Sequence, residues 1–248
     1  MASQMTESVS STASAGMRER LIVALDVSTA REAQALVQRI GEAAGIYKVG
    51  LQLFTAEGPS VVRELVSSGR RVFLDLKLHD IPNTVSHAVK SAVELGAHML
   101  TVHASGGTAM LRAATEAAGN RLHILAVTVL TSLNDEDMQE IGVSGRVADQ
   151  ALRMAALAKN TGCHGVVTSP REAQLLRKEL GEGFAIVTPG IRPAGAETHD
   201  QQRIATPALA IANGASHIVV GRPITAAPDP AAAAQAIISE MEMAKAGR

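Results

Sequence analysis

The chain has 248 residues with 23 basic and 24 acidic side chains, and its formal net charge is −1. That balance excludes the positive surface that binding to a nucleic-acid backbone requires. A hydrophobic content of 46% excludes intrinsic disorder, while the absence of a long apolar run excludes a membrane span. Because the single cysteine, Cys163, cannot form an internal disulfide or a multi-cysteine zinc site, we expect a reducing, cytoplasmic compartment.

From the N-terminus, residues 1–17 are rich in Ser, Thr and Ala and predict a flexible tail, which leaves 18–248 as the catalytic domain. Eight short runs rich in β-branched residues follow, and their near-continuous apolarity is typical of parallel strands covered on both faces. These runs cover 21–27, 45–51, 71–78, 98–104, 123–130, 165–169, 184–191 and 217–224.

Stretches of helical period separate or follow the runs, over 29–44, 59–69, 83–96, 107–119, 145–161, 170–180, 205–213 and 230–246. Thr29 with Glu32, and Ser169 with Glu172, predict capping boxes at two helix starts. The alternation predicts an α/β fold that is a single (β/α)8 TIM barrel, with its active site at the C-terminal rim of the strands. An open doubly wound sheet is the alternative, but no GxGxxG follows the first run. The polar insertion from Asn134 to Gly145 is a candidate lid.

Charged residues interrupt three of the predicted strands near their C-terminal ends. Asp26 lies on the first strand, Lys48 on the second, and Asp75 and Lys77 on the third; Asp80 follows in the next loop. Because side chains two apart on a strand share a face, Asp75 and Lys77 are expected to point the same way. The alternative is a buried ion-pair network that only stabilises the barrel, but ion pairs are a costly core filling. We therefore interpret these residues as a catalytic cluster.

Two late loops carry the signals of a phosphate site. Thr188–Pro193 and Gly221–Pro223 each combine an arginine with a glycine at the end of a predicted strand, and barrels often bind phosphate at these two positions. Solvated arginines in ordinary loops are the alternative. The eight histidines show no metal-binding spacing, so we expect His79 and His103 to be structural.

The motif running from Asp75 through Lys77, Asp80, Ile81 and Thr84 resembles the signature of the orotidine 5′-phosphate decarboxylase family. The resemblance covers nearly the whole chain after the tail. It extends to the segments around Asp26, Lys48-Val-Gly, Val127–Ser132, Pro189–Pro193, Asp200-Gln201 and Val220–Pro223. It implies decarboxylation of orotidine 5′-monophosphate to uridine 5′-monophosphate and CO2, the last step of de novo UMP synthesis, without a metal or an organic cofactor.

The resemblance also implies a role for each matching residue. Lys77 would protonate C6 of the pyrimidine, within a charge network formed with Lys48, Asp75 and Asp80. The other implied substrate contacts are to the ribose hydroxyls (Asp26 and Lys48), the pyrimidine (Thr131 and Ser132), base and phosphate together (Gln201), and the phosphate (Arg192, Gly221 and Arg222). Asp80, Ile81 and Thr84 would enter the active site of the other subunit of a homodimer.

Two other functions are compatible with such a barrel. A metal-dependent sugar-phosphate decarboxylase or aldolase of the same superfamily would bind a divalent ion through Asp26, Asp75 and Asp80, and would be sensitive to EDTA. A catalytically silent sensor of nucleotide phosphates would be expected to have lost the lysine or its carboxylates. Since all four residues of the network are present, the cofactor-free decarboxylase is favoured.

Overall fold

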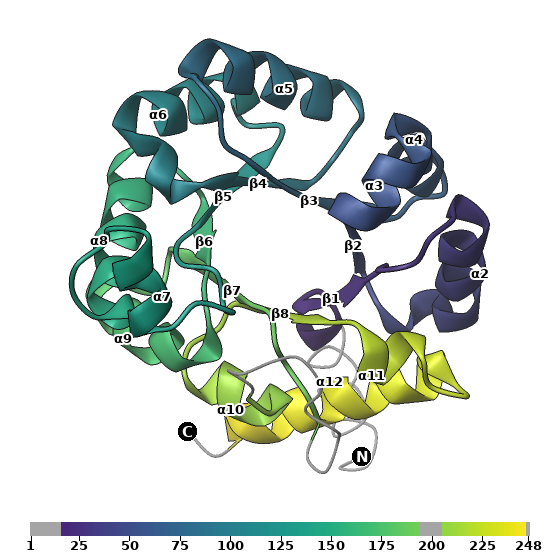
Figure 1. The fold of residues 1–248 in the computed structure, drawn as a ribbon. Helices are drawn as coiled ribbons and strands as arrows, with labels where there is room; N and C mark the ends of the chain where they lie inside the picture. The colour runs from purple at the N-terminus through teal and green to yellow at the C-terminus, as the bar shows by residue number, and fades with distance from the viewer. Residues whose placement is uncertain (1–15, 194–204, 247–248) are drawn as a thin grey trace, which may run out of the picture.

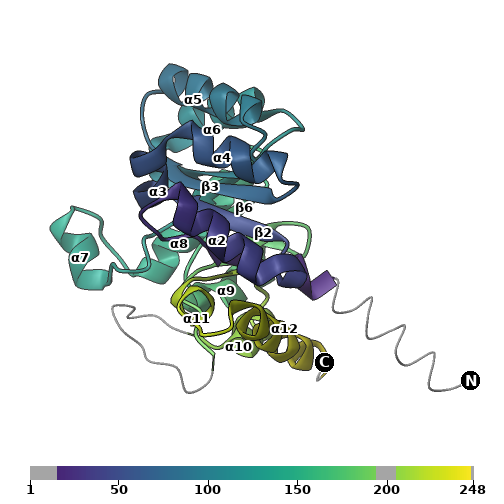
Figure 2. The same cartoon turned by 90° about the vertical axis from the view of Figure 1, so that its right-hand side faces the viewer.

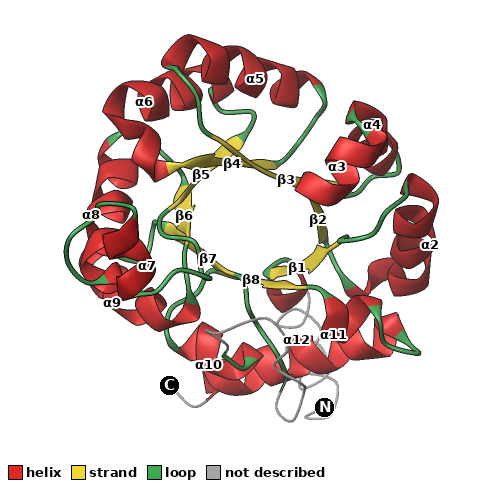
Figure 3. Cartoon of the chain, viewed as in Figure 1, coloured by secondary structure: helices red, strands yellow, loops and turns green. Residues whose placement is uncertain are grey.

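The computed structural model describes residues 16–193 and 205–246. Its eight parallel strands close into a barrel in which each strand pairs with its neighbours in the sequence and β8 pairs with β1. Figure 1 looks along the barrel and shows the strands as an inner ring with the helices outside it, and Figure 3 shows the same division by secondary structure. The predicted (β/α)8 barrel is confirmed.

The strands are β1 (Leu21–Ala24), β2 (Ile46–Gly50), β3 (Arg71–Leu78), β4 (Met99–His103), β5 (His123–Val127), β6 (Gly165–Val167), β7 (Ala185–Thr188) and β8 (His217–Val220). All eight predicted runs contain a strand, but most strands are shorter than the run. The last run, 217–224, is the clearest case. From Arg222 onward its residues form a helix, Arg222–Thr225, instead of extending β8. Apolarity continues past several strands because some residues beyond their ends, such as Leu25, Ala104 and Val129, are also buried.

The helices are α2 (Ala30–Ile40), α3 (Leu51–Glu57), α4 (Pro59–Ser67), α5 (Pro82–Glu94), α6 (Gly107–Ala118), α7 (Asp135–Glu140), α8 (Val147–Asn160), α9 (Pro170–Leu180), α10 (Pro207–Ala212), α11 (Arg222–Thr225) and α12 (Pro230–Ala246). Short 3-10 turns occupy Gly41–Ala43 and Ala104–Gly106. The eight predicted helices are present, whereas α3, α7 and α11 were not predicted. Each of these three is too short to show an amphipathic period.

The predicted helix starts are confirmed at Thr29 and corrected at Ser169. Thr29 and Glu32 form a reciprocal capping box at the start of α2. Ser169 caps α9, but its hydroxyl accepts from the N–H of Arg171 instead of from that of Glu172. Pro170 in the first turn favours this tighter geometry because its ring fixes φ in the helical range.

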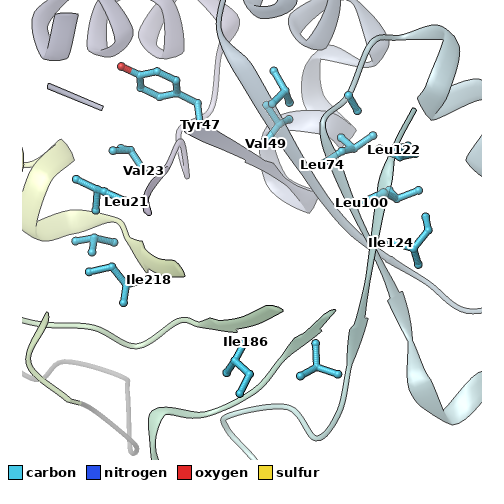
Figure 4. Packing of buried hydrophobic residues seen from close by; sticks show 14 of the residues in the cluster. Leu21, Val23, Tyr47, Val49, Leu74, Leu100, Leu122, Ile124, Ile186 and Ile218 are labelled. Atoms are coloured by element: carbon cyan, nitrogen blue, oxygen red, sulfur yellow. The ribbon is translucent and has the colours of Figure 1, made fainter. Parts of the chain in front are cut away.

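Two apolar layers support the barrel. Outward-facing strand residues pack against the helices, as Figure 4 shows for Tyr47, Val49, Leu74 and their neighbours. A second cluster fills the inside of the ring with Ile22, Ala24, Ile46, Phe73, Met99, Leu125, Val187 and Val219. Continuous apolarity in the sequence therefore reflects strands that are buried on both faces.

The boundary predicted for the tail needs one adjustment. Residues 1–15 lie outside the described part of the chain, but Met17 is buried and packs within the outer apolar layer. The body of the barrel therefore includes Met17. Within the described ranges, none of the helices has the length and apolarity to cross a bilayer.

The insertion after β5 is folded and attached to its neighbours. Asn134 and Asp137 form a capping box at the start of α7, and the Asp135 carboxylate accepts from the N–H of Val147 at 2.7 Å. Met138 is buried in a small cluster with Val129, Val147 and Ala151. Figure 2 shows α7 standing out at one end of the barrel. The segment predicted as a candidate lid thus contains a short helix packed on α8, and its function as a lid stays a prediction.

Candidate active site

A cavity of about 450 Å³ opens at the C-terminal ends of the strands. Its floor is the top of the inner apolar layer, formed by Ala24, Phe73, Val167 and Val219. Eight of the thirteen residues predicted for the site line it: Asp26, Lys48, Asp75, Lys77, Thr131, Arg192, Gly221 and Arg222. The structure therefore brings most of the predicted site residues together at one cavity.

Strand register explains why the charges meet. Ala24 of β1 lies beside Lys48 of β2, Lys48 lies beside Phe73 of β3, and Gly50 lies beside Asp75. Because inward-facing residues occur at every second position, the inside of these strands changes from apolar residues to charged ones toward the rim. The charges of neighbouring strands thus form one layer above the apolar interior.

The four charges form an alternating row. Lys48 Nζ lies 2.8 Å from Asp26 Oδ1 and 3.8 Å from Asp75 Oδ2, while Lys77 Nζ lies 3.0 Å from Asp75 Oδ1. The side chains of Lys48 and Asp75 are only 11% and 14% exposed, whereas that of Lys77 is 29% exposed. Lys77 is therefore the ammonium of the row that is more open to the cavity.

Two arginines reach the same cavity from the late loops. Arg192 is buried, and its Nη1 donates to the carbonyl of Ile191 at 2.9 Å. Arg222 begins α11 and is exposed, with Gly221 just before it. Gly190 has a φ of +76°, a backbone conformation that favours glycine, so the turn favours glycine at this position. Guanidinium groups and a helix start are suited to an anionic group at the cavity edge.

Four of the predicted residues that the structure describes do not line the cavity. Asp80, Ile81 and Thr84 are exposed at the start of α5, and the Asp80 carboxylate accepts from the N–H of Ile81 at 2.6 Å. Ser132 is exposed beyond β5. Gln201 falls outside the described residues.

Sequence reasoning missed several residues of the site. Thr101 of β4 is completely buried beside Asp75 and Lys77. Its hydroxyl in an otherwise apolar run is the feature of the sequence that could have identified it. Gly50 leaves room for the charge row, because a Cβ there would lie 2.8 Å from Lys48 Nζ. The left-handed backbone of Lys77, with φ of +52°, left no trace in the sequence.

His79 and His103 lie near the site with their ring centroids 5.5 Å apart. Burial lowers the pKa of His103, and the nearby His79 and the Lys77 charge lower it further, while the Asp75 carboxylate opposes them. The lowered pKa favours the neutral form of His103 near the Lys77 ammonium. Among the described residues, no group of three or more histidine, cysteine or acidic side chains could hold a metal ion.

Comparison with known proteins identifies relatives over most of the chain. The family model described as "Orotidine 5′-phosphate decarboxylase / HUMPS family" matches residues 19–237. The orotidine 5′-phosphate decarboxylase of Moorella thermoacetica is 52% identical over 237 residues, which cover 92% of this chain and 94% of that protein. That of Halorhodospira halophila is 53% identical over 228 residues, covering 91% and 97%.

Solved structures give the same comparison. The crystal structure of orotidine 5′-phosphate decarboxylase from Lactobacillus acidophilus matches with a TM-score of 0.81 and 40% identity. The match covers 90% of this chain and 99% of that one. The range matched by the family model, 19–237, contains all eight strands and both late loops.

Proposed function

The chain belongs to the orotidine 5′-phosphate decarboxylase / HUMPS family and catalyses the decarboxylation of orotidine 5′-monophosphate to UMP, and we propose that Lys77 donates the proton to C6. The observation that carries this assignment is the alternating row of Asp26, Lys48, Asp75 and Lys77 in the rim cavity. The reaction is the last step of UMP synthesis.

The chemistry explains why a fixed ammonium is useful. When the bond between C6 and the carboxylate breaks, CO2 leaves and the electron pair stays on C6, where the ring offers no delocalisation. A cation held beside C6 stabilises this charge as it develops and then transfers a proton to form the C6–H bond. Lys77 is left neutral and recovers a proton from water. Asp75, held 3.0 Å from Lys77 Nζ, keeps the ammonium in place.

The remaining roles follow the family resemblance. The position of Asp26, Lys48, Thr131, Arg192, Gly221 and Arg222 at the cavity supports those given to these six residues. We propose that Asp26 and Lys48 bind the ribose hydroxyls, that Thr131 and Ser132 lie by the pyrimidine, and that Gln201 bridges base and phosphate. Arg192, Gly221 and Arg222 are proposed to hold the phosphate. Binding energy from this distant group can hold the charged row in its reactive arrangement.

A metal-dependent sugar-phosphate enzyme is not favoured. Its divalent ion would need the carboxylates of Asp26 and Asp75, and both are already paired with lysines at 2.8 and 3.0 Å. The curated relatives at about half identity carry the name of the decarboxylase.

The decisive experiment follows the loss of the orotate absorbance with purified protein in EDTA, with the Lys77→Ala variant in parallel. The absorbance should fall rapidly with the unsubstituted protein. With Lys77→Ala the rate should be at least about 10³-fold lower, because the variant lacks both the proton donor and the cation. Equal rates would refute the role of Lys77. Activity that needs added magnesium would favour the metal-dependent alternative.

We also propose a cytoplasmic homodimer in which Asp80, Ile81 and Thr84 enter the active site of the second subunit. Ile81 is 66% exposed beside the Asp80 carboxylate, which suits a segment that another subunit covers. The buried free thiol of Cys163 suits a reducing compartment.

Mixing inactive subunits tests the shared site. Lys77→Ala and Asp80→Asn are each expected to inactivate the homodimer. After mixing and re-equilibration, one site of each mixed dimer has neither substitution, so about a quarter of the activity should return by random pairing. No recovery from mixed dimers would refute the sharing of Asp80 between subunits.

A further inference from the structure

The strand that carries Lys77 is irregular where it passes β4. Leu74 pairs with Leu100, and the next pairing joins Leu78 to Val102. Three residues of β3, 75–77, therefore face a single residue of β4, Thr101. A bulge of this kind leaves backbone groups without their ladder partners and redirects side chains. Here it lies at the two residues that form the inner ion pair.

Thr101 fills the gap in the ladder with its side chain. Its Oγ1 accepts from the backbone N–H of Lys77 at 2.8 Å and donates to Asp75 Oδ1 at 2.9 Å. The same carboxylate oxygen accepts from Lys77 Nζ at 3.0 Å. The three residues thus close a ring of hydrogen bonds that starts at the Lys77 backbone and returns to the Lys77 ammonium.

This ring holds a backbone conformation that few residues adopt. Lys77 is the one non-glycine residue with positive φ in the described ranges. A side chain in this region is strained and needs its surroundings to hold it there. The hydrogen bond from its N–H to Thr101 is such a restraint, and Thr101 itself is 0% exposed and cannot move into solvent.

We propose that Thr101 is a positioning residue for the decarboxylation, because its hydroxyl sets both the backbone of Lys77 and the carboxylate that orients the Lys77 ammonium. The inference rests on the proposed role of Lys77. Thr101 is not among the residues that line the cavity, so it acts through Lys77 and Asp75.

Loss of the hydroxyl would act at both ends of the ring. The N–H of Lys77 would lose its acceptor, and Asp75 Oδ1 would lose one of its two donors. Asp75 would then be free to turn toward Lys48, whose Nζ already lies 3.8 Å from Oδ2. Because misplacement of a reacting group by about 1 Å can cost about 10²-fold in rate, catalysis should suffer more than binding.

The test compares Thr101→Val, which keeps the shape but lacks the hydroxyl, with Thr101→Ser, which keeps the hydroxyl. We expect kcat of the valine variant to fall about 10- to 100-fold. KM and the affinity for UMP should stay within about threefold, because the groups proposed to bind ribose and phosphate are untouched. The serine variant should stay within about fivefold of the unsubstituted protein.

Thr161→Val serves as the matched control. Thr161 is also a buried threonine, but its hydroxyl donates to carbonyls within α8, so kcat should not change. If Thr101→Val does not fold, Thr101→Ala replaces it, since alanine and serine differ only by the hydroxyl. The alanine variant should then have a kcat at least about tenfold below that of serine.

A valine or alanine variant with kcat within about threefold of the hydroxyl-bearing protein would overturn the positioning role. So would equal losses in the valine and serine variants, because the methyl group and not the hydroxyl would then matter. Absence of decarboxylation by the unsubstituted protein would overturn the proposed function, and this inference with it.

Discussion

Replacing His217 by glutamine should make folding of this barrel less sensitive to acid. His217 begins β8 at the end of the barrel opposite the cavity, and its Nδ1 is buried without a hydrogen-bond partner among the described residues. Burial lowers its pKa to about 4, and the nearby charges of Arg20 and Arg71 contribute. The nearby His98 and His123 lower the pKa of His217 further.

The direction of the pH effect on the free energy of unfolding follows from the pKa of His217 in the folded and the unfolded chain. In the unfolded chain the imidazole has its ordinary pKa of 6.5, so below that pH the unfolded state binds a proton before the folded state does. The folded state therefore loses no free energy of unfolding to His217 above pH 6.5, and it loses progressively more as the pH falls toward 4. For one histidine the loss is about 2 kcal/mol at pH 5 and about 3 kcal/mol at pH 4.

The assay is urea unfolding at pH 8 and pH 5, at one protein concentration, for the unsubstituted protein and His217→Gln. The free energy of unfolding should fall between the two pH values by about 2 kcal/mol less in the variant, since glutamine does not titrate. His87→Gln, at an exposed position on α5, is the control and should preserve the full loss. If the free energy of unfolding fell equally between pH 8 and pH 5 in the unsubstituted protein and in His217→Gln, the role assigned to His217 would be refuted.

Three further predictions concern the site and the core. Arg222→Ala should lower kcat/KM for orotidine 5′-monophosphate about 10²-fold but not that for orotidine, which has no phosphate; equal losses would contradict a phosphate contact. Gly50→Ala should lower kcat about tenfold, because its Cβ would lie 2.8 Å from Lys48 Nζ, while Gly183→Ala, in open space, should not. Burial raises the pKa of Cys163 to about 11, so iodoacetamide at pH 8 should alkylate the native thiol about 10²-fold more slowly than the urea-unfolded one; equal rates would exclude this burial.

The fold could be predicted because its signals are local and repeated. Each strand of a buried parallel sheet is apolar on both faces, and each helix has one apolar face, so the alternation is visible in the sequence. The charged residues of the candidate site could be predicted because Lys48 and Asp75 interrupt runs that are otherwise apolar. What could not be predicted depends on two strands at once. The bulge opposite Thr101 arises from pairing between β3 and β4, and the sequence of either strand alone continues without a break.

The two halves of the barrel interior place different demands on the sequence. Below the cavity, Phe73 and Met99 fill space, and apolar residues of similar volume would serve there. At the rim, Asp75 must accept from Thr101 and Lys77 on one oxygen while the other faces Lys48. A change to any of these partners leaves a charge or a donor unsatisfied in a largely buried position. The apolar layer therefore stabilises the barrel by burial, whereas the strained Lys77 and the row of close charges at the rim are explained by the proposed catalytic role.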